Sequence, residues 1–218
     1  MSQGIWEMNA ANLLKAGGPL MSPILLCSIF SLGITLEKIF YLVSLKENIP
    51  LLKEKIFECI KSNKIKEAIS ICDESRSPVA KILKAGIIKF GSTKDQIQES
   101  MENVSLYEIP KIESRLNALA TIAHISPLLG LLGTVTGMIS CFQSIQAGSA
   151  ALNPLTPGDL AGGIGEALIT TVTGFMVAIP TYIAYNYFVS HINTIILDME
   201  RAATELINYI SHIADTSS

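Results

Sequence analysis

Three long stretches without any Asp, Glu, Lys or Arg constrain this chain more than any other feature of its sequence. They are residues 16–36, 116–158 and 167–197. A transmembrane helix needs about 20 predominantly apolar residues to cross roughly 30 Å of hydrocarbon. The first and third runs fit one span each. The second is longer than a single span, and its Gly- and Pro-containing end, residues 147–158, is typical of a loop. The sequence therefore predicts three transmembrane helices.

The composition agrees with a membrane protein. Of the 218 residues, 49% are hydrophobic and only 16% are charged, whereas soluble domains carry about 25% charged residues. The formal net charge of −3 gives no reason to expect nucleic-acid binding. We therefore expect an all-α membrane protein embedded in the lipid bilayer, with long helices extending into the cytoplasm.

The side chains that usually carry catalysis or hold metals are scattered. The four cysteines form no CxxC pair, and none has a histidine at zinc-ligand spacing. The sequence contains no phosphate-binding loop and no recognisable nucleophile–base pair. We expect no enzyme activity, no metal and no cofactor.

The positions of the basic residues predict the orientation. Thirteen of the 16 Lys and Arg side chains fall between residues 44 and 115, and the other three are Lys15, Lys38 and Arg201. Basic residues stay on the cytoplasmic side of a membrane, so the N-terminus is expected outside and the C-terminus inside. The resulting division is a periplasmic amphipathic N-terminus (1–19), transmembrane helix 1 (20–43), a cytoplasmic helical region (44–118), transmembrane helix 2 (119–147), a periplasmic loop (148–160), transmembrane helix 3 (161–192) and a cytoplasmic C-terminal helix (193–218).

Start and stop signals divide the cytoplasmic region into helices. Pro50 and Pro78 suit first helical positions, Asn63 and Gly91 suit helix ends, and Thr93 with Gln96 has the pattern of a capping box. From Thr93 the pattern predicts one helix that runs through Pro110 into the second span. At 1.5 Å per residue, residues 93–147 are expected to extend about 80 Å.

Small residues recur on the second and third spans, and Gly133 with Gly137 forms a GxxxG motif. In lipid, helices associate through close packing, which small residues permit. We expect close contacts here, within one subunit or between subunits. The predicted helix-packing residues are Gly130, Gly133, Gly137, Gly165, Gly174 and Ala178.

Polar side chains on the same two spans are the candidate functional residues. The second span carries Thr134 and Thr136, and the third carries Glu166 with several threonines. At 100° per residue, most of these threonines lie on the face of Glu166, whereas Thr171 lies roughly 140° away and points towards a neighbouring helix or subunit. The predicted residues of a polar pathway are Thr134, Glu166, Thr170, Thr171 and Thr173.

Each of these groups has a second interpretation. A threonine in a membrane helix often bonds only the carbonyl of its own preceding turn. A carboxylate within a membrane indicates a functional site, but Glu166 also fits a position at the headgroup level, where it caps the N-terminus of its helix together with Asp159.

Two motifs on these spans resemble a known family. Residues 126–138, SPLLGLLGTVTGM, resemble the second-span signature PLLGLLGTVxGM of ExbB and TolQ. Residues 163–171, GIGEALITT, followed by Gly174 and Ala178-Ile179-Pro180, resemble the third-span signature GIxEALxxTxxG…AIP. Tyr185-Asn186 also fits, and the resemblance covers residues 111–193. The chain is thereby identified as a member of the ExbB/TolQ/MotA family of proton channels.

The resemblance implies a homopentamer in the bacterial inner membrane, with the second and third spans lining a pore. A dimer of an ExbD- or TolR-like single-span protein lies inside and carries the aspartate that takes up and releases protons. By motif position, Thr134, Glu166 and Thr171 take the places of pore-lining residues. The sequence departs from the family at Thr136, which is often aromatic, and at Thr170 and Thr173, which are often apolar.

Three functions remain open at this point. An ExbB-like subunit energises TonB and transport through outer-membrane receptors. A TolQ-like subunit drives a TolA-like protein in envelope maintenance. A non-conducting membrane scaffold uses the glycines for packing alone. The three expected spans disfavour a flagellar MotA, because that branch has four.

Overall fold

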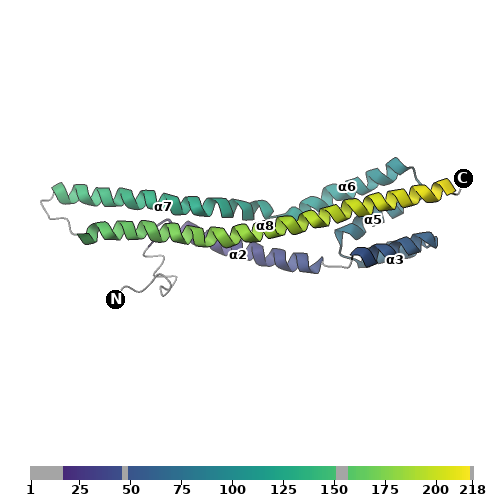
Figure 1. Cartoon of the computed structure of the whole chain (residues 1–218), viewed down its shortest axis with the longest axis horizontal. Coiled ribbons are helices and arrows are strands. Elements are labelled where there is room, and N and C mark those ends of the chain that lie inside the picture. The colour runs from purple at the N-terminus through teal and green to yellow at the C-terminus, as the bar shows by residue number, and fades with distance from the viewer. Residues whose placement is uncertain (1–16, 46–48, 151–156, 217–218) are drawn as a thin grey trace. The chain divides into compact units, whose positions relative to one another are not determined.

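The computed structural model describes residues 17–45, 49–150 and 157–216, and all regular structure within these ranges is helical (Figure 1). The expected N-terminal segment 1–19 therefore lies almost entirely outside the described residues. The helices are α2 (Met21–Ser44), α3 (Ile49–Lys61), α4 (Ile65–Glu74), α5 (Pro78–Ile88), α6 (Lys94–Glu113), α7 (Leu116–Ala150) and α8 (Pro157–Thr216).

Three helical stretches are long and apolar enough to cross a membrane. They are Met21–Lys61, Lys94–Gln146 and Ala161–His212, which include α2 and most of α7 and α8. Their outward side chains are mostly apolar, as Phe30, Leu128 and Ile183 illustrate with exposed fractions above 60%. Exposed apolar side chains on so many turns suit a lipid environment. The prediction of an all-helical, multi-pass membrane protein is confirmed.

The chain divides into two compact units. The first contains residues 1–36 and 115–186, which include most of α2, all of α7 and the beginning of α8. The second contains residues 37–114 and 187–218, which include α3 to α6 and the rest of α8. The proposed polar residues of the spans all belong to the first unit, and the second unit holds most of the basic residues.

The second unit is a helical bundle built on an amphipathic stretch of α8. Figure 1 shows α3, α5 and α6 beside this part of α8. Its buried positions recur every three or four residues, which places them on one face of the helix. They are Phe188, Ile192, Ile195, Met199, Ala202, Leu206 and Ile210. Lys53 on α3 forms an ion pair with Glu205 on α8 at 2.7 Å, and Gly86 on α5 lies so close that a Cβ there would meet Leu206 at 2.8 Å.

The expected start and stop residues of the cytoplasmic helices agree with the structure. Pro50 is the second residue of α3 and Pro78 the first of α5. Asn63 and Gly91 have positive φ angles of 55° and 88° in the turns that follow α3 and α5. Thr93 precedes α6, and its backbone N–H donates to Gln96 Oε1 at 3.4 Å.

The prediction of one helix from residue 93 to residue 147 is wrong. Helix α6 ends at Glu113, Ser114 has a non-helical ψ of 140°, and α7 begins only at Leu116. Arg115 has a φ of 66°, which an L-residue adopts rarely and which no α-helix contains. Pro110 lies within α6 without ending it. The two-residue interruption coincides with the boundary between the two units.

The long continuous helix is instead α8, with 60 residues. At 1.5 Å per residue its length is about 90 Å, three times the hydrocarbon thickness. It joins the expected third span and C-terminal helix without interruption. Helices α7 and α8 also extend into the expected loop 148–160 from both sides, since they end at Ala150 and begin at Pro157, and residues 151–156 lie outside the described ranges.

Candidate functional site: glycine and hydroxyl contacts of the membrane helices

Helices α7 and α8 approach closely where α7 carries glycine. A Cβ at Gly133 would lie 2.5 Å from Thr170 Cγ2, and a Cβ at Gly137 would lie 2.8 Å from both Ala167 Cβ and the Gly163 carbonyl oxygen. Real side chains do not tolerate such separations, so the two helices fit together only because these positions lack side chains. The GxxxG motif therefore forms a contact within one chain.

The same contact continues one turn further along. Gly130 on α7 and Gly174 on α8 lie opposite each other, and a Cβ at Gly174 would be 3.1 Å from Gly130 Cα. Ala178 is buried. Gly165 differs from the other predicted packing residues, because a Cβ there would meet no atom of the described chain within 4 Å.

Thr171 lies close to α7 because Gly130 has no side chain. Its hydroxyl donates to the Gly130 carbonyl oxygen on α7 at 2.9 Å, and it also lies 3.1 Å from the Ala167 carbonyl on its own helix. The expectation that Thr171 points towards a neighbouring helix agrees with this contact. The hydroxyl thus links the two glycine-rich helices inside the chain.

Another side of α8 contacts α2 through a second polar pair. Ser31 Oγ and Thr181 Oγ1 form a buried hydrogen bond of 2.6 Å, and Thr181 also donates to Val177 O at 2.7 Å. Buried hydroxyls in an apolar environment are stable only when they are bonded. Ser31 was not singled out from the sequence, because a lone serine in an apolar run gives no signal of its partner.

Thr170 is buried as well. Its hydroxyl donates to the Gly17 carbonyl oxygen at 2.8 Å, in the segment before α2, and to Glu166 O at 2.8 Å. Its methyl group contacts Gly133 on α7. Thr170 and Thr181 are 1% and 3% exposed, so the hydroxyls of these two threonines are covered by the chain itself.

The other predicted polar residues are less covered. Thr134, Thr171, Thr173 and Glu166 are half-buried, and Thr136 is exposed. Within the described ranges, the hydroxyls of Thr134 and Thr173 donate to carbonyls of their own helices, Leu131 O at 2.6 Å and Ile169 O at 2.8 Å. Every threonine of the predicted set thus has the local bond that membrane threonines commonly form, and two of them, Thr170 and Thr171, also bond another segment.

Glu166 lies deeper in α8 than a helix-capping residue. Helix α8 begins at Pro157, so Glu166 is more than two turns inside it, whereas the favourable effect of a helix N-terminus on a carboxylate is limited to the first turn. Its side chain instead lies against Gly18, just before α2. This contact disfavours the interpretation of Glu166 as a cap of its own helix.

Lys38 is a further residue that the sequence did not identify. It is 2% exposed, and its Nζ donates to the Ile112 carbonyl oxygen at 2.7 Å. The last four carbonyls of a helix have no partner within it, and Ile112 is the second-last residue of α6. The ammonium group therefore caps the C-terminus of α6, where a positive charge is favourable.

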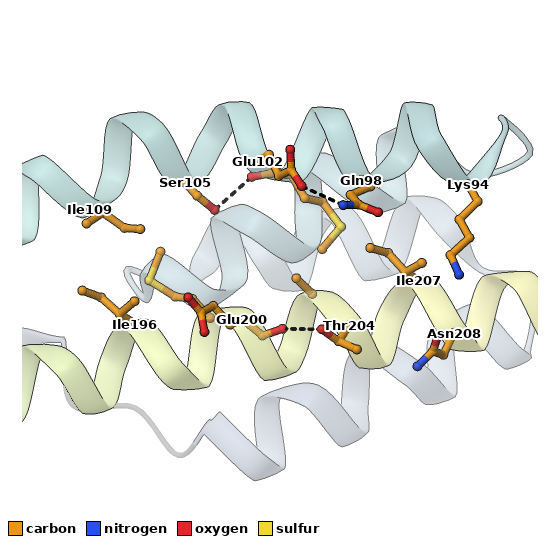
Figure 2. A pocket seen from close by; sticks show the side chains of 13 residues that line it. Lys94, Gln98, Glu102, Ser105, Ile109, Ile196, Glu200, Thr204, Ile207 and Asn208 are labelled. Carbon is orange, nitrogen blue, oxygen red and sulfur yellow. Dashed lines mark hydrogen bonds between the residues drawn. The ribbon is translucent and has the colours of Figure 1, made fainter.

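A cavity of about 550 Å³ lies in the second unit between α6 and α8 (Figure 2). Polar groups along its walls bond within their own helices: Gln98 with Glu102 at 2.7 Å, and Thr204 with Glu200 O at 2.9 Å. Among the residues that the structure describes, no group of three His, Cys, Asp or Glu side chains is arranged to hold a metal ion.

Comparison with known proteins points to one family. The pattern of the MotA/TolQ/ExbB proton channel family matches residues 74–201. An ExbB-like biopolymer transport protein of Synechocystis sp. (ExbB-like 3) is 29% identical over 79% of this chain and 81% of its own length. A second one from that organism (ExbB-like 1) is 31% identical over 80% of this chain and 68% of its own length. The Tol-Pal system protein TolQ of Pseudomonas aeruginosa is 31% identical over 66% of this chain and 65% of its own length.

Proposed function

Because this chain belongs to the MotA/TolQ/ExbB proton channel family, we propose that it is the multi-span subunit of a proton-driven motor in the bacterial inner membrane. Five copies surround a pore that holds a dimer of an ExbD-like single-span protein. Proton flow through this complex energises a TonB-like protein and thereby transport across the outer membrane. The N-terminus faces the periplasm and the C-terminus the cytoplasm.

The observation that carries this proposal is the position of Glu166. It is the one carboxylate on α7 and α8 between Leu116 and Leu197 that lies deeper than the first helical turn, and it is half-buried rather than bonded away in the core. Ionisable groups inside membrane spans are costly and mark ion pathways. Thr134 and Thr173 are half-buried too, and together with Glu166, Thr170 and Thr171 they form the proposed polar pathway.

The chain supplies part of a proton pathway only. One acid and a few hydroxyls do not span a bilayer, so the remaining titratable groups come from the single-span partner. One elementary charge that crosses 100 mV releases about 2.3 kcal/mol. Because this energy is modest, we expect several protons for each mechanical cycle.

A TolQ-like role in the Tol-Pal system is the alternative within the family. It is supported by the TolQ of Pseudomonas aeruginosa, which is 31% identical to this chain, as is ExbB-like 1 of Synechocystis. The genes beside the one for this chain discriminate between the two roles. A gene for a TonB-dependent receptor supports the ExbB-like role, and genes for TolA-, TolB- and Pal-like proteins support the TolQ-like role.

A non-conducting scaffold is the alternative from another class. The contacts of Thr170, Thr171 and Thr181 with neighbouring segments favour it, because these hydroxyls have structural partners. Thr134→Ala discriminates best, since the hydroxyl of Thr134 bonds only its own helix within the described chain. If Thr134→Ala and Thr171→Ala both assemble and keep full energy coupling, the scaffold is the better explanation.

The direct test is proton flux in liposomes that enclose a pH-sensitive dye. The chain is purified with the product of the neighbouring single-span gene, and the mass of the native complex gives its composition. Under an applied potential we expect flux from the wild type and a loss of about tenfold or more in Glu166→Gln. The matched control is Glu113→Gln, an exposed carboxylate at the end of α6, which keeps its flux. A complete complex that carries no protons contradicts the proposal.

A further inference from the structure

The segment before α2 makes two contacts with one face of α8. The Gly17 carbonyl oxygen accepts a hydrogen bond of 2.8 Å from Thr170. The next residue, Gly18, has a φ of 67° and begins the turn in which Met21 N–H donates to Gly18 O at 3.2 Å. Glu166 and Thr170 are four residues apart and therefore lie on the same face of α8. The Gly17–Gly18 turn covers both.

The contact between Gly18 and Glu166 is a close one. A Cβ at Gly18 would overlap Glu166 Oε1, and it would lie 2.7 Å from Glu166 Cδ and 3.4 Å from Cγ. The Glu166 carboxyl group thus occupies the space that a side chain at residue 18 would fill. Glycine suits this position for two reasons: it adopts the left-handed backbone conformation easily, and it leaves room for the carboxyl group.

We propose that Gly18 is a positioning residue for Glu166: the missing side chain admits the carboxyl group against the turn and fixes its orientation in the proton pathway. This inference rests on the proposed function, in which Glu166 belongs to that pathway. The hydrogen bond from Thr170 to Gly17 holds the turn in place, so the turn and the carboxyl group are aligned by the same helix face.

Gly18→Ala tests the proposal. It has two effects, a strained left-handed backbone and a clash with Glu166, and a matched control separates them. Gly91 has a comparable φ of 88°, but a Cβ there would meet nothing within 4 Å. Gly91→Ala therefore measures the cost of the left-handed backbone alone. In the complex with its single-span partner, we expect Gly18→Ala to lower proton flux by about tenfold or more, while Gly91→Ala leaves flux within about twofold of the wild type.

The second arm is a double-mutant cycle with Glu166→Asp. Aspartate is one methylene shorter, so it withdraws the carboxyl group from the added Cβ. We expect Gly18→Ala to reduce flux at least about threefold less in the Glu166→Asp background than in the wild-type background. Equal reductions in both backgrounds overturn the proposal, because they show that the two residues do not act on each other.

The same cycle is measured by thermal unfolding of the complex, which does not depend on proton transport. If the wild type carries no protons, the proposed function fails, yet coupling in the unfolding temperature still shows whether Gly18 accommodates Glu166. If Gly18→Ala does not assemble, recovery of the complex in Gly18→Ala with Glu166→Asp supports the inference, and continued failure overturns it.

Discussion

At the scale of single residues, the threonine hydroxyls of α7 and α8 differ in what they bond, although they look alike in the sequence. Thr171 reaches the Gly130 carbonyl on α7, whereas Thr136 on α7 bonds only Leu132 O and Gly133 O of its own helix within the described chain. A hydroxyl that links two helices contributes to their association, while a local bond adds little.

Replacement by valine, which keeps the shape and removes the hydroxyl, measures this difference. We expect Thr171→Val to lower the free energy of unfolding by about 1 kcal/mol. Thr136→Val is the matched control and is expected to change it by less than about 0.5 kcal/mol. Thermal or denaturant unfolding in detergent provides the measurement. Equal effects of the two substitutions contradict the interhelical role of Thr171.

Cys72 is a buried thiol in the second unit, outside the membrane spans. Burial raises its pKa from the ordinary 9.0 to about 12; the neighbouring Asp73 raises it too, and Lys84 partly opposes them. In the unfolded chain the thiol loses its proton near pH 9, whereas the folded chain retains it. Between pH 9 and pH 12 the unfolded state therefore binds fewer protons, and stability falls as pH rises.

The corresponding prediction is a difference in pH dependence. We expect the unfolding temperature of the wild type to fall more steeply between pH 8.5 and pH 10.5 than that of Cys72→Ala, because the variant lacks the buried thiol. At neutral pH, Cys72→Ala is less stable than the wild type because of the cavity it leaves. Parallel curves for the two proteins contradict the assignment.

At the scale of helices, the contact between α7 and α8 depends on which glycine faces the partner helix. Gly133 faces Thr170 at a separation that admits no further atom, and Gly165 faces open space. Sequence spacing alone placed both in one set of packing residues. Which glycine faces the partner helix depends on how each helix is rotated about its own axis. The glycine pattern specifies this rotation only in part.

Alanine scanning of these two positions tests the contact. We expect Gly133→Ala to destabilise the protein by about 1–3 kcal/mol, because the added methyl group overfills the interface. Gly165→Ala is expected to be neutral or slightly stabilising, since alanine favours helix and has room. Unfolding temperatures in detergent provide the comparison. A loss in Gly165→Ala as large as that in Gly133→Ala contradicts this account of the α7–α8 contact.

At the scale of the whole molecule, the uneven distribution of charge is the basis for the proposed orientation. The second unit contains nearly all Lys and Arg residues, and residues 147–158 between α7 and α8 contain none. Basic loops are retained in the cytoplasm. Ser62, after α3, and Gly158, near the start of α8, are both exposed and lie in these contrasting regions.

Labelling with a maleimide that does not cross membranes tests the orientation. In a variant whose four native cysteines are replaced, we expect Gly158→Cys to react in intact spheroplasts, because the proposed topology places residue 158 in the periplasm. Ser62→Cys is expected to react only after permeabilisation. The opposite pattern, or equal labelling of both before permeabilisation, contradicts the proposed topology.

The sequence by itself determined the class of the protein and most helix ends. Runs without charge identify membrane spans because hydrocarbon penalises charge wherever the run lies in a fold. Pro78, Asn63 and Gly91 fixed local boundaries because their backbone preferences act over a few residues. The motifs around Gly133 and Glu166 were sufficient to indicate the family that the comparisons then established.

Only the tertiary structure decided which groups meet. The break at Ser114–Arg115 has no local signal in the sequence. Because of it, the longest helix is α8 and not the predicted helix over residues 93–147. The partners of Thr170, Thr171 and Thr181 come from 41 to 153 residues away along the chain, and the same is true of Gly18 beside Glu166. A side chain's local pattern gives its face on a helix, but the element that covers this face is set by the packing of distant segments.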